Sequence, residues 1–269
     1  MGVLFLGVYS ASCGTIFQSG GPGTTYTDTL GDGQGSANLL RDISSVTISN
    51  DAVNLYFTLS INPSGNLATG GAFNYGIGIT TGSPTEGGDT SANSTHGNPY
   101  GRTISIDSSF GGMTDWVGIF GAGGSGSTTS PYTSYGYNDY VFGTPTSTSP
   151  AGVWTKINTV SSGQPLSSQP ATSIPNAITV TVPMSDFAAN LSLTPGTTFY
   201  FDVYSTGTSG NQTAYDSLAF QGPIQTGTFS STAQYNGTVL DSYTVPEPTT
   251  LALAGLGGLA LVLFRRGRK

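Results

Sequence analysis

The stretch ISSVTISNDAVNLYFTLSI, residues 43–61, alternates apolar and polar side chains in two short runs. Val46 and Ile48 fall on one face of the first run, and the second run repeats the pattern around Phe57. A period of two is that of a β-strand and does not form the apolar stripe of a helix. Because an Asn-Asp pair at 50–51 marks a turn between the runs, we predict a β-hairpin.

Further short apolar runs follow at broad intervals, separated by segments rich in Gly, Pro and Ser. Only the segment 183–196 looks helical, with Ser185 as a cap and Pro195-Gly196 as the end. We predict an all-β fold: an antiparallel β-sandwich, jelly-roll or immunoglobulin-like, with long Gly/Ser/Thr loops, one short connecting helix and a C-terminal apolar helix. The other predicted strands are 73–80, 102–106, 115–120, 139–142, 152–157, 177–183 and 198–205.

Charged residues make up only 8% of the 269-residue chain, against roughly 25% in an ordinary soluble domain. Long helices usually expose Glu, Lys and Arg, so this scarcity also favours turn-rich β structure. Four of the seven basic residues lie at the C-terminus, at 265, 266, 268 and 269. The remaining chain has three basic and fourteen acidic residues, so it lacks the positive surface that nucleic acid requires. We expect no nucleic-acid partner.

The first residues, MGVLFLGVYSASCG, contain a short apolar run followed by small side chains. This pattern is typical of the end of a secretory signal peptide, although the positively charged start is missing. We interpret 1–14 as a truncated signal peptide that is cut near Ser12 or Gly14. Cys13 is the only cysteine and has no intrachain partner for a disulfide. A lipoprotein signal is less favoured, because Ser10 stands where a large aliphatic residue is needed.

The C-terminal segment TVPEPTTLALAGLGGLALVLFRRGRK has three parts in a fixed order: a Pro-Glu-Pro triplet, an apolar run and a basic end. This order resembles the PEP-CTERM sorting signal of bacterial exported proteins, here over 245–269. The resemblance implies that an exosortase, a membrane transpeptidase, recognises the segment and cuts near the triplet. The product would then reach the cell surface or its extracellular polysaccharide matrix. The residues that the resemblance assigns to processing are Pro246, Glu247, Pro248, Arg265 and Arg266.

The apolar run over 251–264 predicts a helix that enters the inner membrane only transiently. Its fourteen residues span roughly 21 Å at about 1.5 Å each, less than the roughly 30 Å hydrocarbon core. Gly255, Gly257 and Gly258 weaken the helix further. The positive-inside rule keeps the basic end in the cytoplasm and the body outside. A permanent single-pass anchor and a buried core helix are the less favoured alternatives.

The body before this signal is predicted to form one β-sandwich over 24–222, with a linker or a last strand over 223–244. A boundary near Gly121 would leave too few strands on each side. Three stretches, 42–61, 74–82 and 178–205, resemble the sandwiches of carbohydrate-binding module family 9 and DOMON-like domains. The resemblance spans 28–220 and implies binding of sugars or haem. For haem the axial Met or His pair is missing.

Aromatic residues in the second half of the body could stack on sugar rings, while polar neighbours bind hydroxyls. In the alternative, Trp116 and Trp154 are core residues of alternating strands, and the tyrosines belong to a polar loop over 121–140. The predicted carbohydrate-binding residues are Tyr132, Tyr135, Tyr137, Asn138, Asp139, Tyr140 and Trp116.

Asp28 and Asp32, in the stretch DTLGDG, could supply oxygen ligands to Ca²⁺. The spacing is not that of an EF-hand, and a plain Asp-Gly turn is the favoured alternative. We expect no other cofactor or metal.

A nucleophile elbow, a metal-spaced His cluster and a phosphate loop are all missing from the sequence, so we predict no catalytic residues. The leading hypothesis is a non-enzymatic exported protein with a structural or carbohydrate-adhesive role in extracellular matrix. A surface glycan hydrolase would need two carboxylates about 5 to 10 Å apart in one cleft. A purely structural surface-layer component is the third alternative.

Overall fold

The computed structural model describes most of the body of the chain. For some of the described residues the structure gives only the backbone: 120–121, 134–143, 153, 155–165 and 235. The predictions for the signal peptide over 1–14 and the apolar helix over 251–264 lie outside the described residues. The described residues are 15–33, 39–65, 67, 74–83, 88–90, 104–121, 134–143, 153–165, 176–187, 191–207, 214–221 and 235–246.

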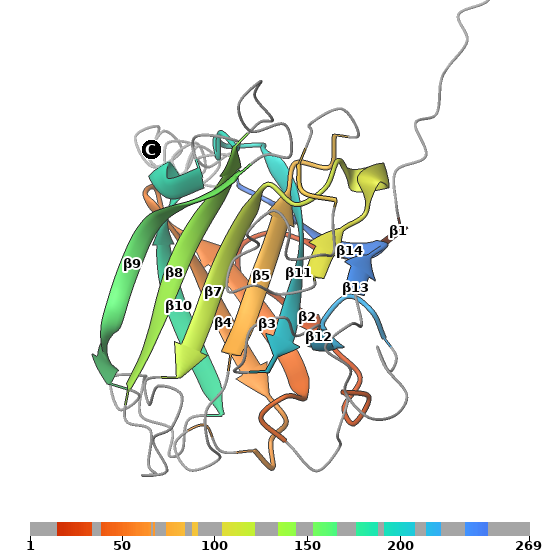
Figure 1. Ribbon diagram of the computed structural model, residues 1–269, viewed down its shortest axis with the longest axis vertical. Coiled ribbons are helices and arrows are strands. Elements are labelled where there is room, and N and C mark those ends of the chain that lie inside the picture. Colours follow the sequence, from red (N-terminus) through yellow and green to blue (C-terminus); the bar gives the residue numbers. More distant parts are fainter. Residues whose placement is uncertain are drawn as a thin grey trace, which may run out of the picture.

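Two large sheets and a small one make up the described fold (Figure 1). The eight-stranded sheet has the order β1 (Thr15–Gly20), β14 (Val239–Thr244), β11 (Thr198–Thr206), β5 (Asn74–Thr80), β7 (Asp115–Gly121), β8 (Ser134–Gly143) and β9 (Val153–Pro165), with β12 (Ala214–Ser217) paired to β11. The four-stranded sheet has the order β10 (Ala177–Pro183), β4 (Asn54–Ile61), β3 (Ile43–Asn50) and β2 (Thr24–Thr27). The small sheet pairs β6 (Ile104–Ile106) with β13 (Tyr235–Gly237).

The pairing is mixed, which corrects the expectation of a purely antiparallel fold. Most neighbours are antiparallel, but β1 pairs with β14 in parallel and β13 pairs with β6 in parallel. Parallel neighbours need a long connection, and each of these pairs joins strands that are far apart in the chain. Neither pair is therefore joined by a short hairpin, which would have forced its two strands to run antiparallel. The prediction of a jelly-roll or immunoglobulin-like type stays a prediction.

The predicted hairpin over 43–61 is confirmed as β3 and β4. Asp51 fixes the turn, because its Oδ1 accepts hydrogen bonds from the backbone N–H groups of Val53 and Asn54, both at 2.7 Å. The Tyr56 hydroxyl donates to the other carboxylate oxygen at 2.5 Å. The sequence reasoning therefore found both the strands and the turn.

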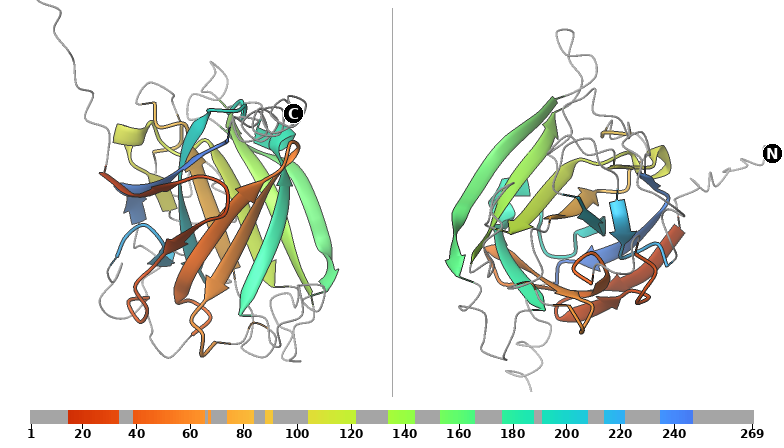
Figure 2. Two further views of the ribbon diagram at one scale, coloured as in Figure 1. Left: turned by 180° about the vertical axis from the view of Figure 1, so that it is seen from behind. Right: turned by 60° about the horizontal axis from the view of Figure 1, so that its bottom comes forward.

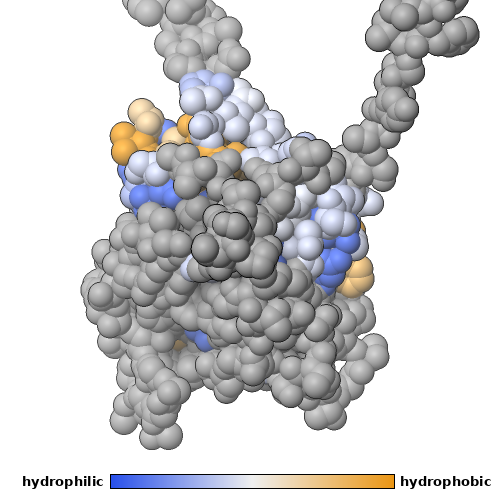
Figure 3. Space-filling view, turned by 45° about the horizontal axis from the view of Figure 1, so that its top comes forward, coloured by the Kyte–Doolittle hydropathy of each residue, from blue (hydrophilic) through white to orange (hydrophobic). Residues whose placement is uncertain are grey.

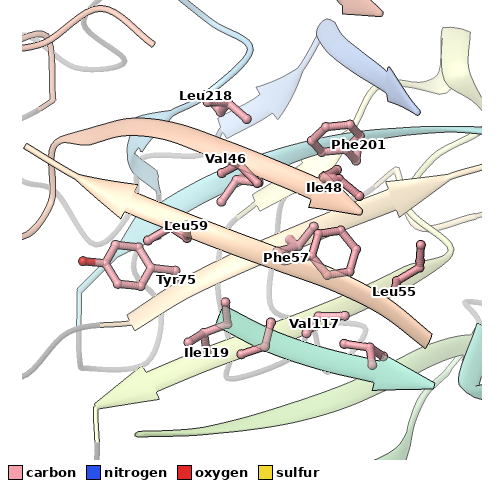
Figure 4. Close-up of a cluster of buried hydrophobic side chains, with 14 of the residues drawn as sticks. Val46, Ile48, Leu55, Phe57, Leu59, Tyr75, Val117, Ile119, Phe201 and Leu218 are labelled. Atoms are coloured by element: carbon pink, nitrogen blue, oxygen red, sulfur yellow. The ribbon is translucent and has the colours of Figure 1, made fainter. Parts of the chain in front are cut away.

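The main hydrophobic core lies between the two large sheets, which face each other in Figure 2. Figure 4 shows Val46, Phe57 and Leu59 of the four-stranded sheet beside Val117 and Ile119 of β7. All of these side chains are buried, and burying each contributes about 1.5–3 kcal/mol. The alternation in the sequence thus turns one face of each sheet toward the other.

A second core covers the opposite face of the eight-stranded sheet. Trp116 lies in this cluster, whereas its neighbour Val117 lies in the main core, as alternation along β7 requires. Met113 and Tyr204 pack in the same cluster. Gly76 makes room for the indole, since an added Cβ there would lie 2.0 Å from a ring carbon of Trp116. The eight-stranded sheet is therefore covered on both faces in this region.

Helical structure is minor in the described part of the chain. The connecting helix predicted within 183–196 is a short 3-10 helix, η5 (Met184–Phe187), and a second one is η3 (Ser108–Phe110). Among the described residues, no helix has both the length and the apolar character needed to span a membrane.

Candidate functional site

Three aspartates from opposite sheets come together in the fold. Asp28 follows β2 directly, Asp32 lies four residues further along the same segment, and Asp216 belongs to β12. Each carboxylate contributes an oxygen to a group in which all atoms lie within 4.8 Å of one another. We call these three residues the aspartate cluster.

A tight turn brings Asp28 and Asp32 to the same place. Gly31 has a φ of 88°, a left-handed conformation that glycine adopts without strain. Its N–H donates to both carboxylate oxygens of Asp42, at 3.0 and 3.1 Å. The Asn62 amide also donates to Asp42, at 2.6 Å. Asp42 thus holds the turn.

Asp216 connects the two sheets. Its Oδ2 accepts from the N–H of Ile43, the first residue of β3, at 2.6 Å, and its Oδ1 accepts from the N–H of Ser217 at 3.0 Å. Gly33 packs closely over it, because an added Cβ would lie 3.4 Å from the Asp216 carboxyl carbon. The carboxylate is fully buried but retains a lone pair on each oxygen.

The other two carboxylates are only partly satisfied. Asp28 Oδ1 accepts from the N–H of Thr29 at 2.7 Å and from the side-chain amide of Gln221 at 2.9 Å. Asp28 Oδ2 and both oxygens of Asp32 have no hydrogen-bond partner, and each exposes less than 1 Å². Buried polar atoms normally have partners, so these three oxygens are exceptions that need an explanation.

Burial makes the charged form of this cluster unfavourable. Burial raises the pKa of Asp32 to about 6. Burial also raises the pKa of Asp28 and of Asp216 far above the ordinary range, and repulsion from neighbouring carboxylates adds to the effect. The Arg41 guanidinium lies 4.0 Å from the centre of the Tyr215 ring, in a cation–π contact. A bound cation or bound protons would relieve the repulsion within the cluster.

Sequence reasoning identified Asp28 and Asp32 but missed Asp216. A local stretch can reveal only neighbours in the chain, and Asp216 joins the cluster through the pairing of β12 with β11. The surrounding stretch, AYDS, has no ligand pattern. Only the tertiary fold brings the third carboxylate into place.

The two tryptophans belong to the interior, which is the alternative raised from the sequence. Trp116 is 2% exposed and stacks on Tyr204 with the ring centres 6.1 Å apart. Trp154 is also buried, and its indole N–H donates to Asp89 at 2.9 Å. The burial of Trp116 argues against its proposed part in a sugar-binding platform, because a stacking face must be reachable by the sugar.

The predicted tyrosine-rich loop is instead a regular strand from Ser134 onward. In β8, Tyr140 lies opposite Trp116 and Asn138 lies opposite Gly118. The side chains of this strand and all of Tyr132 lie outside the described residues. The other predicted sugar-binding residues in β8 are Tyr135, Tyr137 and Asp139.

The start of the C-terminal segment is part of the folded body. Thr244 ends β14, and the next residue, Val245, is 3% exposed. Val245 donates its N–H to the carbonyl of Thr197 and accepts from the N–H of Gly196, both at 2.8 Å. Pro246 is the last described residue. Glu247, Pro248, Arg265 and Arg266 lie outside the described part.

Comparison with known proteins identifies this segment. The family model for the PEP-CTERM protein-sorting motif matches residues 244–269, which confirms the interpretation of the C-terminus. No curated protein matches the chain, and no solved structure does. The resemblance of the body to carbohydrate-binding module family 9 and to DOMON-like domains receives no support. The motif indicates an exported surface protein that an exosortase sorts.

Proposed function

We propose that the chain is a non-enzymatic protein of the cell surface or extracellular matrix, with a carbohydrate-adhesive role. The observation that carries this proposal is the junction between the body and the sorting motif. The motif starts at Thr244, the last residue of β14, so no separate linker precedes it. Cleavage near the Pro-Glu-Pro triplet would deliver the complete β-sheet body.

The burial of the aspartate cluster supports a non-enzymatic role. A glycan hydrolase needs a pair of carboxylates that reach the substrate, and the cluster does have the required closeness. Its unpartnered oxygens, however, expose less than 1 Å² each. A glycosidic oxygen cannot contact atoms that a water-sized probe does not reach.

Composition and strand order support adhesion. The body has few charges and many hydroxyl and amide groups, which suit contacts with neutral sugars. Figure 3 shows hydrophobic residues in small separate areas of the visible described surface. Three of the four tyrosines proposed to stack on sugar rings, Tyr135, Tyr137 and Tyr140, lie in β8, next to the edge strand β9 of the eight-stranded sheet (Figure 1). Aromatic faces there would bind a polysaccharide that lies along the edge.

Fractionation of a host that has an exosortase tests the sorting. We expect the wild-type chain outside the inner membrane in a shortened form. A triple variant, Pro246→Ala, Glu247→Ala and Pro248→Ala, should remain full-length in the inner membrane. The variant Glu86→Ala, which changes a glutamate outside the motif, should be sorted normally. A full-length wild-type chain retained in the inner membrane would contradict the sorting.

Affinity electrophoresis on a panel of neutral and acidic polysaccharides tests the adhesion. We expect at least one polysaccharide to retard the chain, and Tyr137→Ala to reduce the retardation more than Tyr56→Ala does. Tyr56 serves as the control because it belongs to the hairpin of the other sheet. Migration unchanged by every polysaccharide would contradict adhesion. Self-association in sedimentation without sugar binding would favour the purely structural alternative, and release of reducing sugar would favour the hydrolase.

A further inference from the structure

We propose that Asp28, Asp32 and Asp216 bind one calcium ion, which joins the segment after β2 to strand β12 of the opposite sheet. The geometry of the cluster suits such an ion. Oxygen ligands lie 2.3–2.6 Å from Ca²⁺, so two ligands of one ion are at most about 5.2 Å apart. The three carboxylate oxygens, all within 4.8 Å of one another, satisfy this limit.

The unpartnered oxygens are an independent observation that points to a ligand. Both oxygens of Asp32 are buried and accept no hydrogen bond, so either of them is available to bind a metal. Asp28 Oδ2 is available as well, because its hydrogen bonds with Thr29 and Gln221 use only Oδ1. A buried carboxylate oxygen with no partner is costly, whereas the same oxygen is a good ligand for a hard cation.

The charges around the cluster also favour a cation. Three carboxylates converge there, and Asp42 adds a fourth acidic group next to Asp32. Asp42 is already engaged by Gly31 and Asn62, so it positions the turn and is not needed as a ligand. A divalent cation would offset most of the repulsion that burial intensifies.

Calcium fits this site better than magnesium. The cluster provides acidic oxygens from an irregular turn and a strand, and Ca²⁺ accepts 6–8 oxygens in flexible geometry. Mg²⁺ demands a near-octahedral arrangement and gives up its water reluctantly. Carbonyl groups of the turn and water would complete the coordination of Ca²⁺. Extracellular calcium modules typically bind with a dissociation constant of roughly 10⁻⁴–10⁻³ M, and we expect this range here.

The ion would strengthen the contact between the sheets at this point. Asp216 already accepts from the first N–H of β3, so a metal bound to it would fix the start of β3, the turn over 28–33 and β12 together. This inference is independent of the adhesive role, and either one can fail without the other.

Calorimetry and thermal unfolding of the full chain in mild detergent test the proposal. After treatment with a chelator, added CaCl₂ should bind at one site and raise the unfolding temperature of the wild type. Asp32→Asn should weaken Ca²⁺ binding by at least roughly tenfold, since even changes outside the ligand shell often have that effect. Asp186→Asn, in η5 and outside the cluster, should bind Ca²⁺ as the wild type does.

The sign of the stability change separates a ligand role from a structural one. With the chelator present, Asp32→Asn should be at least as stable as the wild type, because it removes a repelled charge. With saturating Ca²⁺, the wild type should be the more stable protein. Asp28→Asn should show the same reversal and provides the test if Asp32→Asn does not fold.

Three outcomes would overturn the inference. An unfolding temperature of the wild type that is the same with Ca²⁺ and with chelator would show that the folded protein binds no calcium. Unchanged Ca²⁺ affinity in Asp32→Asn and in Asp28→Asn would place any calcium elsewhere. An equal response to MgCl₂ would contradict the assignment to calcium.

Discussion

Asp241 in β14 is a single buried residue with a marked effect on pH dependence. Burial and the neighbouring Asp202 raise its pKa to about 8, while the Gln18 N–H, which donates to it at 2.8 Å, lowers the pKa. The folded state therefore binds a proton that the unfolded state releases near pH 4. The contribution is fully present below pH 4 and is lost as the pH rises through 8.

We predict that Asp241→Asn loses less stability than the wild type between pH 5 and pH 9. The difference should be on the order of 4 kcal/mol, because the amide has no charge to bury at high pH. Denaturant unfolding of both proteins at the two pH values measures it. Parallel pH profiles would contradict the raised pKa of Asp241.

Gly76 is a second residue whose effect can be predicted. Gly76→Ala should destabilise the protein by about 1–3 kcal/mol, because the new methyl group would overlap the Trp116 ring. Gly21→Ala is the matched control, since its Cβ would lie 3.6 Å from the nearest atom, the Thr244 carbonyl oxygen. Equal denaturation midpoints for the two variants would contradict the close packing at Trp116.

At the scale of single elements, the hairpin of β3 and β4 depends on Asp51. Hydrogen bonds from Tyr56 and from the N–H groups of Val53 and Asn54 lower the Asp51 pKa to about 2. A lowered pKa means that the ionised form stabilises the fold. That contribution is present above pH 4 and is lost as the pH falls through 2.

We predict that Asp51→Ala lowers the unfolding temperature by a few degrees at neutral pH. The effect should diminish as the pH falls toward 2, where about half of the wild-type Asp51 carboxylates are protonated. Scanning calorimetry of Asp51→Ala and of Asp186→Ala, as the control, measures the loss. A pH-independent difference would show that Asp51 acts through its shape and not its charge.

Elements with apolar alternation were predictable from the sequence, and those stabilised by polar contacts were not. The hairpin, β5, β7, β10 and β11 all carry alternating or continuous apolar residues, and each was expected close to its observed bounds. Strand β12 has the sequence AYDS, and its buried polar residues, Asp216 and Ser217, depend on hydrogen bonds to distant partners. Strand β2 buries only Tyr26. Short strands of this kind have no periodic signal.

At the scale of the whole molecule, the boundary between the body and the sorting motif can be tested by truncation. A chain that ends after Val245 should unfold cooperatively, because it retains β14. A chain that ends after Gly237 should not fold, since it loses the buried side chains of Leu240 and Tyr243. Near-UV circular dichroism and limited proteolysis distinguish the two. A folded shorter chain would show that β14 is dispensable.

The neighbouring positions of β1 and β14 have a consequence for the order in which the protein matures. Residues 15 and 239 pair directly. Strand β1, one of the first described segments to be synthesised, therefore cannot pair until β14, one of the last, has been made. The β14 position in the eight-stranded sheet, between β11 and β1, stays vacant while the chain emerges. A polypeptide that cannot complete its sheet during translation remains longer in a form that can be threaded through a membrane. The topology therefore favours folding after export, on the side of the membrane where the protein is to act.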